Sequence, residues 1–111
     1  MSNDSTIKKV ESDHSPMGDM GQKFLVAGKK VSMRLWEKIP KGEAENPYSH
    51  DYETVGYVIS GKARLEIEGQ QILLNPGDSW LVPPGARHLY HVNEKFTAVE
   101  ASSPPAEFHG E

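Results

Sequence analysis

Alternating apolar and polar residues dominate the middle of the chain and predict a series of short β-strands. The cleanest example runs from Lys62 to Glu68, where Ala63, Leu65 and Ile67 fall on one face and polar residues fall on the other. This two-residue period is typical of a strand with one buried face. Runs of similar texture, separated by Gly, Pro and Asn, lie at 23–27, 31–37, 55–60, 70–74, 79–82, 89–92 and 96–101.

No window combines a helical period with capping residues, so the chain is predicted to be all-β. Many short strands at close spacing favour a sandwich or a barrel. We expect two strands joined through Gly61, a loop at 40–47 and a turn at 75–78, where breakers cluster. The polar ends predict a flexible N-terminal arm at 1–20 with a short strand at 7–10, and a C-terminal tail at 103–111. The barrel domain is predicted at 21–102.

Composition narrows the classes of function. The chain has 111 residues, no cysteine and a formal net charge of -4, which fits one domain without disulfides or thiolate metal sites. Its lysines and arginines form no basic stripe, so nucleic acid is not an expected partner. The first twenty residues hold no apolar run for a signal peptide, and no segment is apolar enough to span a membrane. We therefore expect a cytoplasmic protein without membrane contact.

Two segments carry glycine, proline and histidine at the spacings of the two cupin motifs. The first motif reads Gly, five residues, His, one residue, His, three or four residues, Glu, six residues, Gly. The second reads Gly, five residues, Pro, one residue, Gly, two residues, His, three residues, Asn. About half of the chain resembles them, which implies a cupin-type double-stranded β-helix, a jelly-roll barrel whose lumen can hold a small ligand. The matching positions are Gly42, His50, Gly61, Gly77, Pro83, Gly85 and His88, whereas Asn93 falls one place late.

The resemblance also implies a metal site, and the chain departs from it. Metal-binding cupins supply two His and one Glu from the first motif and one His from the second. The corresponding residues here are Tyr48, His50, Thr54 and His88. Two histidines alone bind weakly, because zinc sites use three or four protein ligands and iron oxygenases use two His and a carboxylate. We expect iron, manganese, zinc or nickel to be absent or weakly held by His50 and His88, with Tyr48, Glu53 or solvent completing the shell. Glu53 would need a bulge to face inward.

Residues of one parity are predicted to share the barrel interior. The chain also resembles a cupin subgroup that reads His-x-His-x-His-x-Gln before Gly-Tyr-Val, with Tyr and Thr replacing several of these residues. His50 and His88 are candidate bases, and Tyr48 and Tyr52 are candidate acids, although the tyrosines could equally be aromatic fillers. The predicted ligand-binding set is Tyr48, His50, Tyr52, Thr54, His88 and Tyr90.

Other positions leave alternatives open. The segment 31–37 divides into a face of Ser32, Arg34 and Trp36 and a more apolar face of Val31, Met33 and Leu35. We predict that the more apolar face is core, with Arg34 and Trp36 as further candidates for the cavity lining. His14 and His109 are expected to be solvated in the tails, and His91 is expected to face outward or into a subunit contact.

Three functions fit these observations. The first is a protein that binds a polar small molecule in the barrel without proven catalysis. The second is a metal-dependent dioxygenase or isomerase. The third is a metal-independent sugar epimerase or isomerase with a His base and a Tyr acid, as in some cupins. We also expect a homodimer in which apolar residues of the arm pack on the partner, namely Ile7, Val10, Met17 and Met20.

Overall fold

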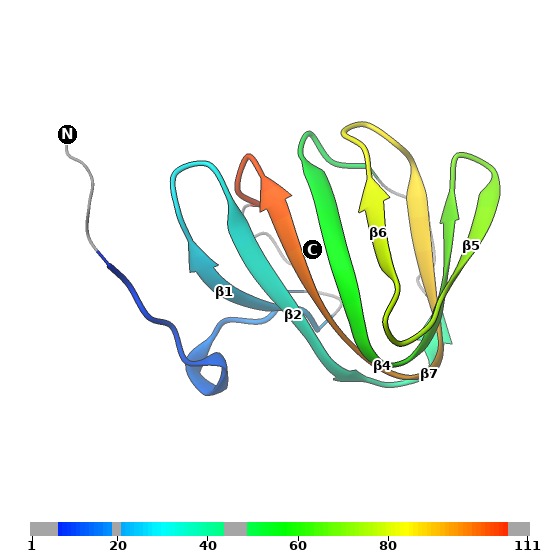
Figure 1. The fold of residues 1–111 in the computed structure, drawn as a ribbon, viewed down its shortest axis with the longest axis horizontal. Coiled ribbons are helices and arrows are strands. Elements are labelled where there is room, and N and C mark those ends of the chain that lie inside the picture. The colour runs from blue at the N-terminus through cyan, green and yellow to red at the C-terminus, as the bar shows by residue number, and fades with distance from the viewer. Residues whose placement is uncertain (1–6, 19–20, 44–48, 107–111) are drawn as a thin grey trace.

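The computed structural model describes residues 7–18, 21–43 and 49–106. This part of the chain is all-β, as predicted, apart from one short 3-10 helix (Figure 1). All strand pairs are antiparallel, in the order β1-β2-β7-β4-β5, with β3 beside β7 and β6 beside β4. The elements are η1 (Ser12–His14), β1 (Lys23–Ala27), β2 (Ser32–Ile39), β3 (Gly42–Glu43), β4 (Glu53–Ile67), β5 (Gln70–Leu74), β6 (Ser79–Val82) and β7 (His88–Ser103).

Two long strands, β4 and β7, run through both walls of the barrel. The first half of β4 lies between β6 and the end of β7, and its second half lies between β5 and the start of β7. The register shifts between Val58 and Ala63, which lets β4 bend from one wall into the other. Gly61 sits in this bend with φ 83°, and a Cβ there would lie 1.9 Å from the carbonyl oxygen of Lys95. Only glycine fits that close approach.

The strand boundaries correct several predictions. The runs at 55–60 and 62–68 are one strand, and so are 89–92 and 96–101, because pairing continues through the bends. The predicted loop at 40–47 contains β3, which pairs with β7. The predicted strand at 7–10 is wrong: these residues form no strand, and Ile7 is 96% exposed. Met17 instead forms an isolated bridge with Lys23.

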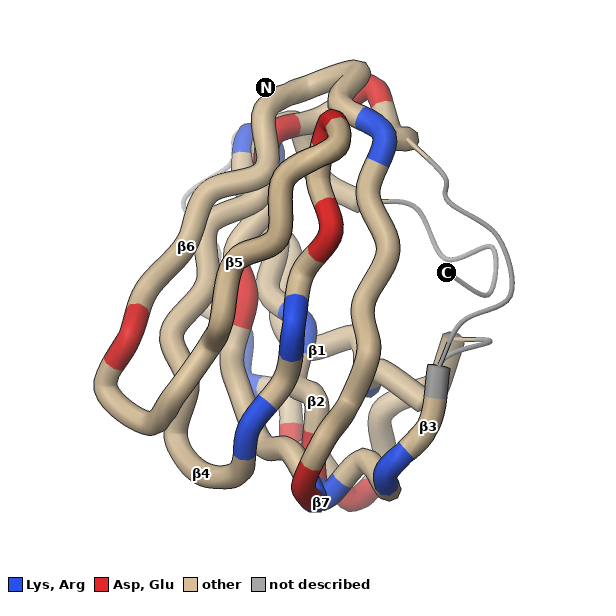
Figure 2. Tube along the Cα trace, turned by 90° about the vertical axis from the view of Figure 1, so that its right-hand side faces the viewer, with Lys and Arg blue, Asp and Glu red and all other residues tan. Residues whose placement is uncertain are grey.

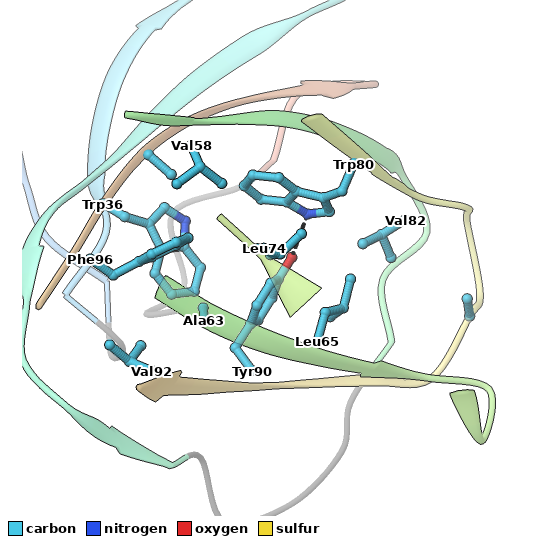
Figure 3. Close-up of a cluster of buried hydrophobic side chains, with 12 residues drawn as sticks. Trp36, Val58, Ala63, Leu65, Leu74, Trp80, Val82, Tyr90, Val92 and Phe96 are labelled. Atoms are coloured by element: carbon cyan, nitrogen blue, oxygen red, sulfur yellow. Dashed lines mark hydrogen bonds between the residues drawn. The ribbon is translucent and has the colours of Figure 1, made fainter. Parts of the chain in front are cut away.

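The core lies between the two walls, where large side chains from both meet (Figure 3). The Trp36 ring meets Tyr90 edge to face at a centroid distance of 4.9 Å and Phe96 at 6.0 Å. Trp80 donates its indole N–H to the Tyr90 hydroxyl oxygen over 3.1 Å, which satisfies a buried donor. These contacts fix the aromatic rings that border the interior face.

The interior face of β2 is the polar one, so the predicted core face of this strand was wrong. Arg34 and Trp36 are buried, whereas Val31 and Met33 are 48% and 37% exposed. The register places Arg34 directly beside Glu100 on β7. A buried guanidinium is tolerated there because the carboxylate partner compensates its charge.

Charged residues of both signs are distributed along the strands, without a segment dominated by either (Figure 2). In the ranges described above, no helix has the length and apolar character needed to cross a membrane.

The contact between Gly56 and Trp80 gives a test of the packing. A Cβ on Gly56 would lie 2.4 Å from the Trp80 ring, so Gly56→Ala must displace that ring. We expect the free energy of unfolding to fall by about 1–3 kcal/mol, the usual range for overpacking. Urea denaturation measures this, with Gly28→Ala as control, because a Cβ at position 28 would lie 3.6 Å from the Val31 carbonyl oxygen, an ordinary van der Waals distance. Equal stability of the two variants would contradict the packing described here.

Candidate functional site

The two motif segments meet through the backbone. The Gly85 N–H donates to the His50 carbonyl oxygen over 2.7 Å, which holds the segment before β4 against the turn before β7. The same turn closes with a bond from the Ala86 N–H to the Pro83 carbonyl. His88 then opens β7, and its Nδ1 lies 3.0 Å from the Ala86 carbonyl oxygen. Residues far apart in the sequence are thereby brought to one end of the barrel.

Four rings follow one another at this end. Tyr52 and His50 stack with centroids 4.6 Å apart and planes 7° from parallel. His50 meets His88 at 5.4 Å, and His88 meets Tyr90 at 5.8 Å, both edge to face. We call Tyr52, His50, His88 and Tyr90 the ring cluster. The structure therefore brings together four of the six residues predicted to bind a ligand.

Two further candidates, Thr54 and Glu53, do not belong to the ring cluster. Thr54 is buried on the interior face, and its hydroxyl shares a 2.9 Å hydrogen bond with Ser102. Glu53 is exposed, and the register runs without a bulge from Glu53 to Val58, so the bulge that would turn Glu53 inward is absent from this stretch. Tyr48 and His109 lie outside the described residues.

The two other described histidines, His14 and His91, do not belong to the ring cluster. The His14 side chain is 81% exposed, beside Glu11. His91 points to the outer face, as expected from its parity, but it is buried there and its Nε2 pairs with the Glu66 carboxylate. The contact with Glu66 on the outer wall accounts for the burial of His91 without a role in the interior.

An ion pair in the interior was not predicted. The Arg34 Nη2 lies 3.1 Å from the Glu100 Oε1, and the two side chains are 4% and 1% exposed. The Arg34 guanidinium also lies 5.8 Å from the centre of the Tyr52 ring and 5.9 Å from that of Phe24. These are cation–π distances. Through Tyr52, the ion pair is connected to the ring cluster.

Burial determines the charge of His88. It lowers the pKa of His88 below the ordinary value of 6.5, while the bond to Ala86 and the charge of Glu100 oppose this and Arg34 adds to it. His88 is therefore neutral at pH 7. Because the Ala86 carbonyl can only accept, Nδ1 carries the proton and Nε2 carries the lone pair.

The donors among the described residues do not fit a resident metal ion. His50 and His88 are two imidazoles, and in the part of the chain that the structure describes no three His, Cys, Asp or Glu side chains form a metal-binding group. Structural and catalytic metal centres use three or four protein ligands. Glu100, the buried carboxylate, is paired with Arg34 instead.

The comparisons with known proteins agree with this architecture. The chain is 28% identical over 97 residues to quercetin 2,3-dioxygenase from Bacillus subtilis (strain 168), covering 84% of this chain but 29% of that protein. The structure of KdgF from Halomonas sp. superposes with a TM-score of 0.77 at 21% identity, covering 92% of this chain and 97% of that one.

A third relative is Pac13 from Streptomyces, described as a nucleoside dehydratase. It superposes with a TM-score of 0.76 at 16% identity, covering 95% of this chain and 88% of that one, and two of its variants were solved with uridine. At these identities the solved structures show a shared fold. Residues 35–101 match the cupin domain family, and the protein is a member of that family with its β-barrel fold.

Proposed function

We propose that the protein binds a polar small molecule at the ring cluster, in the end of the barrel where the two motifs meet. The observation that carries this proposal is the convergence of His50, Tyr52 and His88, with ring centroids 4.6 and 5.4 Å apart. Small-ligand sites combine apolar and aromatic walls with a few polar groups that fix orientation. A neutral imidazole offers one donor and one acceptor, which suits hydroxyl or carboxylate groups of a ligand.

Metal-independent acid–base catalysis is the second candidate. A neutral His88 with its lone pair on Nε2 can accept a proton, and Tyr52 and Tyr90 are the nearby phenols that could donate one. The relative described as a nucleoside dehydratase supports this candidate by analogy of fold. Catalysis can be tested by following the exchange of solvent deuterium into a candidate sugar or nucleoside. Exchange that occurs with the unaltered protein and is lost in His88→Gln would support catalysis over binding alone.

Titration with small molecules tests the binding proposal. We expect at least one of uridine, glucose and citrate to shift the imidazole NMR resonances of His50 and His88 in a saturable way. His88→Ala should weaken that binding by about tenfold, because a hydrogen bond to the ligand is lost. His14→Ala, on the exposed 3-10 helix, serves as the matched control and should bind as the unaltered protein does. If none of the three probes shifts His50 and His88, the proposal is contradicted.

The lowered pKa of His88 makes stability depend on pH. Between 6.5 and the lower pKa of the folded state, the unfolded chain binds more protons at this position. The contribution of His88 to the free energy of unfolding is therefore fully present above pH 6.5, and it is lost as the pH falls towards the lower pKa of the folded state. Thermal unfolding of the protein and of His88→Gln across this range measures the effect. A slope with the same size in both proteins would show that His88 does not contribute.

The metal content of the purified protein is a further prediction. Because the described donors provide two imidazoles, we expect well below one metal ion per chain after purification without added metal. Elemental analysis for iron, manganese, zinc and nickel measures this. Full occupancy that disappears in His50→Ala and His88→Ala would contradict the prediction and favour a metal-dependent dioxygenase or isomerase.

We also propose that the protein is a homodimer. Met33, Val55 and Leu81 lie at registered positions on the outer wall, and they are 37%, 47% and 51% exposed. Their exposure and that of Ile7 and Met17 in the arm leave apolar surface that a partner can cover. We expect part of the arm of one chain to pack on the other.

Light scattering at micromolar concentration tests the dimer. We expect the mass of two chains, and we expect Val55→Asp to shift the population towards one chain because it places a charge on the apolar wall. Glu94→Gln, on an exposed side chain away from these residues, is the control. A monomeric mass for the unaltered protein would contradict the proposal.

A further inference from the structure

We propose that Arg34 and Glu100 are ligand-binding residues of the same site, and that they select a neutral, polyhydroxylated ligand. This inference rests on the proposed function and adds the chemical class of the ligand. Neither residue corresponds to a position of the two cupin motifs.

The ion pair of Arg34 and Glu100 is almost completely buried. Both side chains are at most 4% exposed, and they lie on neighbouring strands at registered positions. Taking two charges out of water is expensive, and apolar replacements of similar volume are often neutral or stabilising. The adjacent inward pair is Trp36 with Ala98 on one side and Ser32 with Ser102 on the other, so small and apolar side chains flank the charges. A requirement other than stability therefore accounts for the charges.

The Arg34–Glu100 ion pair adjoins the ring cluster through Tyr52. The guanidinium lies 5.8 Å from the Tyr52 ring centre, and Tyr52 stacks on His50. The charges of Glu100 and Arg34 also act on the pKa of His88, in opposite directions. A molecule seated on the Tyr52 ring would lie beside the guanidinium that pairs with Glu100.

A buried donor on the same strand points to a ligand oxygen. The Trp36 side chain is 1% exposed, and its indole N–H has no hydrogen-bond acceptor among the described residues. Trp36 follows Arg34 by two positions, so both side chains extend from the same face of β2. Buried donors are almost always satisfied, and a hydroxyl oxygen of a ligand would satisfy this one.

Charge balance favours a neutral ligand over an anion. Arg34 and Glu100 cancel each other, and His88 is neutral at pH 7. An anion placed beside them would bring an uncompensated charge into the interior, which is unfavourable. A polyhydroxylated molecule needs no counter-charge, because the carboxylate accepts from its hydroxyls and the guanidinium donates to them. Its apolar ring face would pack on the aromatic rings.

Matched probes and matched variants test this inference. Glucose and glucuronate have the same ring and differ by a carboxylate, so they compare a neutral and an anionic ligand directly. We expect glucose to shift the His50 and His88 imidazole resonances and glucuronate to bind at least about tenfold more weakly. The double variant Arg34→Met with Glu100→Leu should keep its melting temperature and lose about tenfold or more of the glucose affinity.

The controls separate a binding role from a structural one. Lys23→Met with Glu37→Gln removes an ion pair between β1 and β2 that is partly exposed, with 2.8 Å between Nζ and Oε1, and should leave glucose binding unchanged. If the double variant of the interior pair does not fold, Glu100→Gln gives the same comparison with the shape of the side chain retained. That variant should also lose about tenfold of the affinity.

The contradicting outcomes are distinct from failure of the proposed function. Glucose binding that is unchanged in a folded interior variant would show that the pair is structural only. Tighter binding of glucuronate, or binding of citrate without binding of glucose or uridine, would overturn the neutral class while leaving the site itself supported. No response of His50 and His88 to any of these probes would overturn both proposals.

Discussion

The antiparallel pairing of β4 with β7 is the constraint on which the rest of the structure depends. These two strands are registered from Glu53 opposite Ser103 to Ile67 opposite His88, and they form part of both walls. Every other strand joins the barrel through one of them, apart from β1, which pairs with β2. A shift of one residue in this pairing would turn the interior side chains to the outside. The register therefore determines which residues can form a site.

The same register places a row of paired residues, including the Arg34–Glu100 ion pair, inside the barrel. Arg34, Glu100 and Gly56 are consecutive partners across β2, β7 and β4, and Trp80 on β6 lies over Gly56. The glycine leaves room for the indole, whose N–H is bonded to Tyr90 in the ring cluster. The packing of Trp80 on Gly56 therefore also positions Tyr90, one of the rings of the proposed site. The row joins the ion pair to the rings from which the proposed site is built.

The sequence was sufficient for the elements whose signal is local. Alternation in 62–68 and the glycine, proline and histidine spacings led to the all-β barrel and to the cupin resemblance. The same parity argument brought His50 and Tyr52 to one side, and the structure stacks their rings on each other, with His50 beside His88.

Features that depend on long-range pairing were missed. The polar face of β2 turned inward because its partner across the sheet is Glu100, which hydrophobicity within 31–37 cannot reveal. Glu100 itself has the parity of Phe96 and Ala98, and this was the available signal for its burial. The joined strands were missed because Gly61 reads locally as a turn, whereas its positive φ serves a bend within β4.

The most direct measurement of the central claim is where a bound ligand lies relative to the two faces of β4. Intermolecular NOEs from uridine protons can be assigned to Tyr52, which is buried directly before β4, and to Tyr57, which is 50% exposed on the outer face of β4. The account predicts NOEs to the ring protons of Tyr52 and His88 and none to Tyr57. NOEs confined to Tyr57 and its neighbours on the outer wall would contradict a binding site inside the barrel.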